Sequence, residues 1–560
     1  MNMLFDSGKA ATAAGPDRRE TENPSQRIIG RLILCNGSRA IISASATEIS
    51  GFNADTWAIG RLISIKGEKG RIVGIVYEMN TTSELWQDDS NNVIYIKVEL
   101  VGEITDTPQG PSFRSGIGTY PALGSIAHRI RHADLQSIYQ AGRGSVIEIG
   151  TLSQDSTIKA HVNVDMMLSR HFAVMGTTGV GKSSAVSILL RRATTAKPNL
   201  RVLILDPHNE YTKAFTDISL TIDAATLELP FWLFRIEEFA DVIFRGNKID
   251  EDEVEILREM VTQAKLRHNV APSPSATPSL IKKPVTIDSS GLNADTPVPY
   301  RMSDLMKLIE DEMGKLESKH ARPNMRALLH RLQTLNHEPR FRFMFSRSTI
   351  DDNMDAILSR IFRIPIDNKP IAVFQLAGLP SEVVNSVASV LSRIAFEIAM
   401  WSEGTYEILL LCEEAHRYVP ADASQSFGPT RAAIARIAKE GRKYGAYLGI
   451  VTQRPGELDP TILSQCSTIF AMRLSNERDQ DIVRSAISDS SASTISFLSS
   501  IGNREAITFG EAVGTPMRIK FVTQESHYLP KTASGGHDGE RSTARQEVST
   551  RLVVNRMRGG

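Results

Sequence analysis

The sequence lacks the features that mark secreted, metal-clustered or membrane-spanning proteins. Its three cysteines, Cys35, Cys412 and Cys466, show neither the pairing of a disulfide framework nor the spacing of metal ligands. No apolar run approaches the roughly 18 residues of a membrane span, and the N-terminal residues lack the apolar region of a signal peptide. Lysine plus arginine and aspartate plus glutamate both number 64, so the chain has no overall excess of either charge. These absences predict a soluble cytoplasmic protein that has no membrane partner. They leave nucleic acid possible as a partner, because positive charge can be confined to a channel.

The periodicity of the apolar residues divides the chain into parts. Between 27 and 165, short runs with a period of two, such as Ile94–Leu100, are separated by glycine and asparagine turns, which favours a small β-barrel. From 166 onward, strand-like runs alternate with helical ones, which is typical of a parallel α/β sheet. In chain order the expected parts are a disordered tail (1–26), the barrel (27–165), the two segments of the α/β core (166–231 and 366–525), a helical insertion (232–365) and a C-terminal extension (526–560).

Within these parts, a few segments carry specific expectations. Ser381 is predicted to be the N-cap of a long helix whose apolar positions run from Val384 to Ile398. Six prolines between 268 and 300 predict a loop inside the insertion. In the C-terminal extension, Leu552–Val554 is the one apolar patch. The expected core strands are His171–Met175, Arg201–Leu205, Ile371–Leu376, Glu407–Cys412, Tyr447–Thr452 and Thr468–Leu474.

Residues 176–183 read GTTGVGKS and fit the phosphate-binding pattern G-x-x-x-x-G-K-[ST]. An apolar strand-like run precedes them and a helix-like run follows, which is the setting this loop requires. Backbone N–H groups at a helix N-terminus would bind a polyphosphate, with Lys182 neutralising it and the Ser183 hydroxyl reaching Mg²⁺. The alternative is an ordinary glycine-rich turn. The residues expected to bind ATP are Gly176, Thr178, Gly179, Val180, Gly181, Lys182, Ser183 and Ser184.

Two acids follow the apolar strand predicted at 407–412. Hydrolysis needs an acid on the Mg²⁺ side of the nucleotide and a base that orients the attacking water. Glu413 is expected to take the first role, as a metal ligand together with Ser183, and Glu414 the second. A strand that is apolar throughout is typical of a central parallel strand, buried on both faces. The alternative is a pair of surface glutamates just beyond a strand.

Asp206 and Gln453 each stand at the end of another predicted strand. In an open α/β sheet, ligands bind at the carboxyl ends of the strands. Asp206 is therefore expected to join the Mg²⁺ and water network, although Pro207 could mark a simple turn. Gln453 is expected to touch the γ-phosphate or its water, the alternative being a loop glutamine before Pro455.

Arg442 lies in a basic stretch at the end of a predicted helix. A plain explanation is that cations favour the negative end of the helix dipole. The alternative is an arginine finger that reaches the γ-phosphate of a neighbouring subunit and makes hydrolysis depend on oligomerisation. We expect Arg442 to be that finger.

Together these motifs, in this order, resemble the HerA family of FtsK-like DNA translocases over about 27–525. Glu413 stands where the family has an aspartate, and Asn209 where it has a glycine, which asparagine can replace if the turn needs a positive φ. Phe113–Gly116 and Tyr120–Gly124 resemble the end of its N-terminal HAS barrel, Asp206–Tyr211 its D-P-H-G-E-Y element, Glu413–Arg417 its Walker B element, Lys439–Lys443 its E-G-R-K element and Thr452–Pro455 its S-Q-R-P element.

The resemblance implies a RecA-like core of the ASCE P-loop type and a homohexameric ring. ATP with Mg²⁺ would lie at the subunit interfaces, and double-stranded DNA would pass through the pore. A bacterial member would work with an effector docked on the barrel face, a nuclease or a sirtuin-like NAD hydrolase, in anti-phage defence or DNA end processing. The chain shows no nuclease-like metal cluster, so any cutting is expected to come from another chain.

Two functions of different class remain open at this point. One is a motor that translocates along duplex DNA. The other is a ring scaffold that assembles and switches an effector, with ATP as the signal, and the substitution at Glu413 leaves room for it. A conjugation or packaging ATPase shares the P-loop core, but the N-terminal barrel argues against that class.

Overall fold

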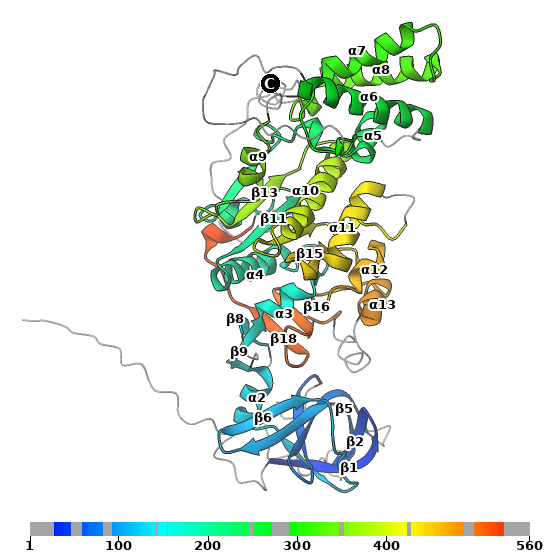
Figure 1. The fold of residues 1–560 in the computed structure, drawn as a ribbon. Helices are drawn as coiled ribbons and strands as arrows, with labels where there is room; N and C mark the ends of the chain where they lie inside the picture. Colours follow the sequence, from blue (N-terminus) through cyan, green and yellow to red (C-terminus); the bar gives the residue numbers. More distant parts are fainter. Residues whose placement is uncertain are drawn as a thin grey trace, which may run out of the picture. The chain divides into compact units, whose positions relative to one another are not determined.

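A computed structural model describes ten stretches of the chain (Figure 1). The expected tail at 1–26, residues 271–290 of the proline-rich segment and Leu552–Val554 lie outside them. The chain forms two compact units, one of residues up to Asn163 together with Arg473–Val522, the other of Val164–Met472 with the residues from Thr523. The described residues are 27–45, 59–81, 92–140, 144–153, 155–245, 250–270, 291–345, 352–422, 427–486 and 498–530.

The first unit begins with a closed barrel, which confirms the prediction of a small N-terminal barrel. The sheet order is β2-β1-β7-β3-β4-β5-β6, and a further pairing of β2 with β5 closes six strands into a barrel. Isoleucine, valine and leucine side chains that alternate along the strands fill its core. The strands are β1 (Ile28–Asn36), β2 (Arg39–Ser45), β3 (Leu62–Lys66), β4 (Arg71–Thr81), β5 (Val93–Thr107), β6 (Gly110–Ser115) and β7 (Ile126–Arg129), followed by helix α2 (His132–Tyr139).

The barrel is shorter in sequence than the expected 27–165. The strands β8 (Val146–Leu152) and β9 (Asp155–Asn163) pair instead with each other and with β18 (Met517–Phe521). Next to β18 lies β17 (Glu505–Gly510), so these four strands form an antiparallel array. Helix α13 (Glu477–Ala486) belongs to the same unit. The pairing of β8 with β18 joins segments more than 350 residues apart, which a local sequence pattern cannot reveal.

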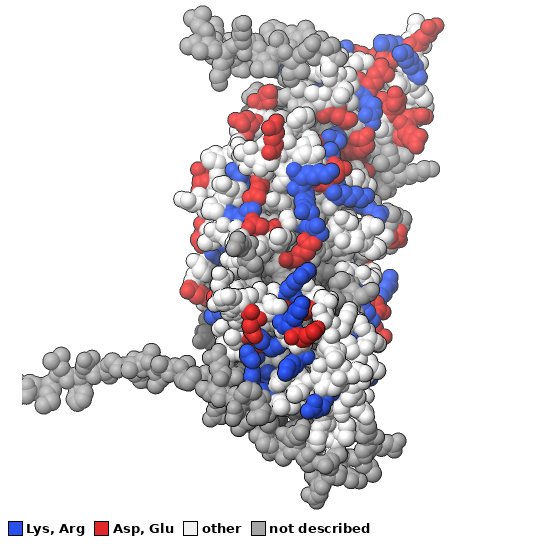
Figure 2. Space-filling view, turned by 60° about the horizontal axis from the view of Figure 1, so that its bottom comes forward, with Lys and Arg blue, Asp and Glu red and all other residues white. Residues whose placement is uncertain are grey.

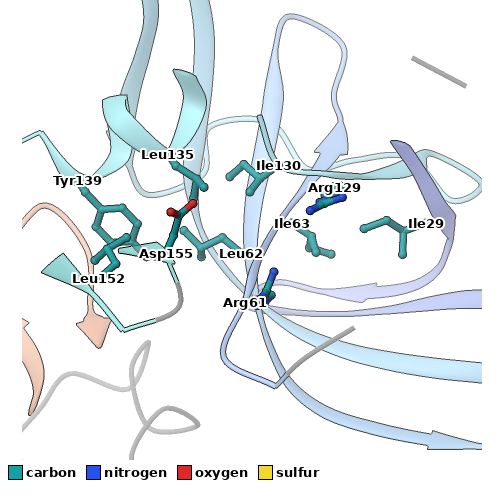
Figure 3. A pocket seen from close by; sticks show the side chains of 10 residues that line it. All are labelled: Ile29, Arg61, Leu62, Ile63, Arg129, Ile130, Leu135, Tyr139, Leu152 and Asp155. Carbon is teal, nitrogen blue, oxygen red and sulfur yellow. The ribbon is translucent and has the colours of Figure 1, made fainter. Parts of the chain in front are cut away.

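A pocket in this unit lies where the barrel meets α2 and β8 (Figure 3). Leu62 and Ile63 of β3 line it, with Leu135 and Tyr139 of α2 and Leu152 of β8. Burial raises the pKa of Tyr139 well above its usual value, so the phenol stays neutral. The lining is mostly apolar, and it makes α2 the element that packs the barrel against the four-stranded array.

The second unit is built on a parallel sheet with the order β12-β13-β11-β14-β15-β10-β16. All six predicted core strands are present, with ends that differ by at most three residues. The additional strand, β12, has only four residues and two of them are polar, so its sequence carried no strand signal. The strands are β10 (Phe172–Met175), β11 (Leu200–Asp206), β12 (Ser219–Ile222), β13 (Ile371–Gln375), β14 (Glu407–Glu413), β15 (Ala446–Thr452) and β16 (Thr468–Ala471).

Helices cover both faces of this sheet. Helix α4 (Lys182–Ala196) packs on β10 and β11, whereas α10 (Ser381–Trp401) and α11 (Gly428–Glu440) pack on β14 and β15. The connection through α4 leads from β10 to β11, which is the opposite direction across the sheet from the connections through α10 and α11. Because crossovers between parallel strands are right-handed, α4 lies on the other face of the sheet. By length and composition α10 could span a membrane, but two thirds of its apolar window is buried in this unit. The N-cap of α10 is Pro380, so the prediction for Ser381 was wrong by one residue.

The insertion between β12 and β13 is helical, as predicted. Helices α6, α7 and α8 contact one another, and α5 contacts α10 of the core. The helices are α5 (Ile236–Phe244), α6 (Glu251–Val270), α7 (Met302–Gly314), α8 (Arg322–His337) and α9 (Met354–Ile361); elsewhere in the unit lie α3 (Val164–Ser169) and α12 (Pro460–Leu463).

Candidate nucleotide-binding site

Four neighbouring strands bring their carboxyl ends to one edge of the core sheet. In the parallel register, Met175 of β10 pairs with Thr452 of β15, and Glu413 of β14 pairs with Val451 of β15. Asp206 ends β11, which lies on the other side of β14. The residues that follow these strands therefore meet at the edge where an open α/β sheet binds its ligands.

The predicted phosphate-binding loop connects β10 to α4 at this edge. The N–H of Gly176 donates to the Thr452 carbonyl oxygen at 3.3 Å, which fixes the start of the loop. Gly179 and Gly181 have φ values of 81° and 104°, a region that favours glycine. A Cβ added to Gly179 would meet nothing within 4 Å, so this glycine borders open space. Val180 is buried and Ser184 half-buried at the start of α4.

Lys182 and Ser183 begin helix α4, and both already have partners within the chain. The Lys182 side chain is buried, and its Nζ donates to the Thr177 carbonyl oxygen at 3.2 Å. The ammonium group therefore lies over the loop itself. The Ser183 hydroxyl donates to a carboxylate oxygen of Glu210. This places an acid beside the hydroxyl that is expected to reach the metal.

Glu413 is buried at the end of β14 and accepts a hydrogen bond from the hydroxyl of Tyr211. Burial raises the pKa of its carboxyl group well above the usual range, and the charges of Glu210 and Glu414 add to that shift. The Tyr211 hydroxyl works in the opposite direction, but burial and the neighbouring acids have the larger effect on this carboxyl group. Its surroundings favour the neutral form until a cation arrives.

Glu414 turns out of the strand with a positive φ of 50°. Its Oε2 atom is buried and accepts no hydrogen bond from the described residues, and His416 Nδ1 lies 3.4 Å away. Burial raises the pKa of Glu414, although the nearby Lys182 works in the opposite direction. Burial also lowers the pKa of His416, which keeps that ring neutral. A buried carboxylate oxygen without a partner is costly, and such groups are concentrated at functional sites.

The carboxylate of Asp206 has its hydrogen-bond donors within its own turn. It accepts the backbone N–H groups of His208 at 3.3 Å, Glu210 at 3.1 Å and Tyr211 at 3.0 Å. Asp206 therefore shapes the turn, and Glu210 and Tyr211 are the residues that reach Ser183 and Glu413.

Sequence reasoning missed Glu210 and Tyr211 as site residues. The signal was present, because both belong to the element 206–211, but their contacts join strands that the sequence does not show to be neighbours. The same turn confirms the expectation for Asn209, whose φ is 56°.

Gln453 follows β15 and contacts the phosphate-binding loop. Its side-chain oxygen accepts a hydrogen bond from the Thr178 hydroxyl, and the preceding residue Thr452 contacts His416 Nδ1 through its hydroxyl at 3.1 Å. The structure thus brings Gln453 to the same edge as Lys182 and Glu414. One amide side chain links the loop to the end of β15.

Arg442 is the predicted site residue that does not join the others. It lies in the 3₁₀ turn Gly441–Lys443, before the first residue of β15, and its side chain is exposed. Since β15 has seven residues that rise about 3.3 Å each, the turn lies about 20 Å from the carboxyl edge. A Cβ on Gly441 would come within 2.3 Å of the Ala446 carbonyl oxygen, so glycine is needed for this turn to pack against the strand.

The residues at the carboxyl edge fit a nucleotide with Mg²⁺. Hydroxyl and carboxylate oxygens are the ligands that Mg²⁺ prefers, and Ser183, Glu210 and Glu413 offer them together. Two further observations that a bound group would explain are the open space beside Gly179 and the buried Oε2 of Glu414, which accepts no hydrogen bond from the described residues. The sequence alone did not reveal that Glu210 belongs to this donor set.

Comparison with known proteins agrees with this assignment. A family model described as "Helicase HerA, central domain" matches residues 147–395. The chain is 24% identical to the DNA double-strand break repair helicase HerA of Pyrococcus furiosus, over 80% of this chain and 81% of the relative. It is 27% identical to the helicase of the same name from Sulfolobus acidocaldarius, over 85% of this chain and 91% of the relative.

Among solved structures, VirB4 of Thermoanaerobacter pseudethanolicus aligns with a TM-score of 0.48 and 15% identity, over 69% of this chain and 99% of that one. The match to the family model, the matches to relatives that are covered over most of their length, and the order of the motifs all indicate the same family. Residues 147–395 therefore belong to the HerA family of helicases, and the chain is a P-loop ATPase.

Proposed function

We propose that this ATPase is a motor on double-stranded DNA that works as a homohexameric ring with nucleotide between its subunits. The observation that carries the proposal is the separation of the hydrolytic groups. Lys182, Glu414 and Gln453 meet at the carboxyl edge of the sheet, whereas Arg442 is exposed at the opposite edge. An arginine so placed can act on a γ-phosphate only in another copy of the chain, which a ring supplies.

Each residue of the edge has a distinct part in the proposed reaction. When bound, Mg²⁺ with ATP supplies the reacting phosphoryl group and the cation that balances its charge. Lys182 would neutralise phosphate oxygens, and Ser183 and Glu413 would hold the metal, with Glu210 beside them. Glu414 orients the attacking water and accepts its proton, for which a buried carboxylate with a raised pKa is suited.

Gln453 completes the proposed site from the end of β15. Its contact with Thr178 holds the amide against the phosphate-binding loop, where it can sense whether a γ-phosphate is present. Asp206 contributes indirectly, because its three backbone hydrogen bonds hold Glu210 and Tyr211 in position.

Duplex DNA is the proposed substrate of the motor. The relatives matched over most of this chain are named as DNA double-strand break repair helicases. On the face shown in Figure 2, lysine and arginine side chains are interspersed with aspartate and glutamate rather than gathered into one broad patch. This distribution is compatible with a non-specific contact with DNA that is limited to lysine and arginine residues lining a pore. The proposed location of the protein is the cytoplasm.

The barrel is the proposed docking surface for a protein effector, a nuclease or an NAD hydrolase, in DNA end processing or anti-phage defence. Four large apolar side chains are exposed around one shallow groove of the barrel, and such a patch is a common mark of protein interaction. They are Ile33, Leu34, Tyr120 and Leu123, with exposed fractions of 46%, 42%, 55% and 68%.

A second candidate function is a ring scaffold that switches its effector by binding ATP. The burial of Glu413 favours it, because burial and the neighbouring acids raise the pKa of its carboxyl group, and the acid on the metal side must lose its proton before it can hold Mg²⁺. Such a site could turn over slowly. In that case ATP binding would carry the signal and hydrolysis would only reset it.

ATP turnover of the purified chain, measured with duplex DNA of increasing length, separates the two functions. A motor should show turnover that rises with length and then saturates, and Lys182→Ala should lose it by failing to bind ATP productively. A response that stays flat at every DNA length would favour the scaffold. In that case, adding the effector should change turnover.

A further inference from the structure

His171 is a buried titratable residue that the proposed reaction does not use. It lies between α3 and β10 with a φ of 59°, and its backbone N–H donates to the Leu168 carbonyl oxygen at 3.1 Å. Residues other than glycine seldom adopt this left-handed region, and where they do, the surrounding contacts hold them there. The contacts of the His171 side chain therefore indicate what this conformation serves.

The imidazole ring of His171 binds the backbone of two other elements. Its Nε2 atom lies 3.1 Å from the Ala438 carbonyl oxygen in the last turn of α11, and its Nδ1 atom accepts the Leu448 N–H of β15 at 3.0 Å. Because a carbonyl oxygen only accepts and a backbone N–H only donates, Nε2 carries the proton and the ring is neutral. Burial lowers the pKa of His171 to about 4, which keeps the ring neutral at physiological pH. Both ring nitrogens are thus engaged with the backbone.

These two contacts flank the turn that carries Arg442. Ala438 precedes Arg442 in the chain and Leu448 follows it, so a single ring holds the backbone on both sides of the turn. The Arg442 side chain is exposed and forms no hydrogen bond or ion pair with the described residues. Its position is therefore set by the backbone of its turn and not by partners of its own.

A second buried contact of α11 offers a comparison. At the other end of this helix, the Thr430 hydroxyl donates to the Asn385 carbonyl oxygen of α10 at 2.8 Å. Thr430 is buried, like His171, and its contact also ties α11 to the core through a backbone carbonyl group. It lies in the first turn of α11, whereas Arg442 follows the last turn.

We propose that His171 is a positioning residue for Arg442, which fixes the end of α11 against β15 so that the arginine reaches the γ-phosphate bound by the next copy of the chain. The inference rests on the proposed function, because it takes Arg442 to act on a neighbouring subunit. His171 also precedes the strand β10, which leads into the phosphate-binding loop. An effect on Arg442 must therefore be separated from an effect on the ATP site of the same chain.

The test uses mixtures of two impaired variants of the whole chain. Lys182→Ala lacks a productive ATP site but retains Arg442 in its place, whereas His171→Asn should retain the ATP site and misplace the arginine. Asparagine tolerates a positive φ, and its amide oxygen can take the place of Nδ1, but it is too short to reach Ala438. Alone, His171→Asn should lower kcat by roughly 10- to 100-fold with little change in KM for ATP, since a misplacement of about 1 Å can cost that much. Mixed with Lys182→Ala, it should regain turnover, because the other variant brings a correctly placed arginine to its site.

The outcomes separate this inference from the proposed function. If the mixture has no more turnover than its two components, or if His171→Asn alone has a normal kcat, the positioning role is overturned. The reference is Arg442→Ala mixed with Lys182→Ala. Failure of that mixture would remove the finger from the proposed function, and the role of His171 would fall with it.

The control for a general loss of stability is Thr430→Val, which removes one buried hydrogen bond from the other end of α11. It should keep its kcat, and a loss equal to that of His171→Asn would contradict the proposal. Circular dichroism checks that His171→Asn folds. His171→Gln, whose longer amide can still donate to Ala438, should lose less turnover than the asparagine variant and takes its place if that variant does not fold.

Discussion

Two buried clusters of charge lie in the core unit, and they differ in how completely they are paired. Between α5 and α10, Glu238 accepts hydrogen bonds from the Arg393 guanidinium at 2.9 Å and from the Ser389 hydroxyl at 3.0 Å. Arg393 also donates to Glu397 at 3.0 Å, which in turn binds Arg235 at 2.7 Å. Burial lowers the pKa of Arg393, but its acidic partners outweigh that effect and the pKa is raised, so the guanidinium stays charged.

At the nucleotide edge the charged groups are paired less completely. Glu413 and Glu414 both lie near Lys182, one oxygen of Glu414 accepts no hydrogen bond from the described residues, and the pKa values of both acids are raised by burial. A cluster that serves stability satisfies its own charges, whereas one that binds a ligand leaves some of them for the ligand to satisfy. This difference in charge pairing distinguishes a structural network from a ligand-binding site without the use of sequence motifs.

The largest expected effect is that of Glu414→Gln on catalysis. Loss of the proposed base should lower ATP turnover by roughly 10²- to 10⁴-fold, while ATP remains bound. The melting temperature should stay the same or rise, because an amide in this position no longer has an unpaired buried charge. Turnover and thermal unfolding, measured on the same sample, check both halves. Normal turnover in this variant would remove Glu414 from the proposed reaction.

The sequence predicted the parts of this comparison that are local. The phosphate-binding loop at 176–183 and the acids at 413–414 are contiguous, and their apolar strands are buried on both faces, so strand, loop and helix could be placed from pattern alone. The barrel was also predictable, because its period of two is maintained over several strands.

The contacts that define the site could not be predicted in the same way. Tyr211 reaches Glu413 across 202 residues of sequence, and Arg393 pairs with Glu238 across 155. Such contacts depend on which strands and helices the fold makes neighbours. For the same reason Asp206 was expected in the metal network, whereas its carboxylate binds the backbone of its own turn.

Arg393→Met breaks the paired cluster and should act on stability rather than on chemistry. It leaves the buried carboxylate of Glu238 without its main partner, which should cost about 3–5 kcal/mol of unfolding free energy. Urea unfolding followed by circular dichroism measures it. The double variant Glu238→Gln/Arg393→Met should be less destabilised than the sum of the two single changes, since the charge is removed together with its partner. Additive losses would mean that the pair is not coupled.

The smallest expected effect is a difference in the pH dependence of stability at Glu413. Burial holds the pKa of its carboxyl group above that of the unfolded chain, so the folded state binds more protons between the two values. Stability contributed by this group is therefore present below about pH 4.5, the ordinary glutamate value, and falls as pH rises toward the folded pKa. The slope can reach about 1.4 kcal/mol per pH unit. Glu413→Gln should flatten that decline and leave the hydrogen bonds between Glu238 and Arg393 intact. Melting temperatures of the two proteins between pH 5 and 8, without nucleotide, measure the difference. Parallel curves would show that Glu413 is already ionised in the free protein, and the edge would then be ready for Mg²⁺ before ATP arrives.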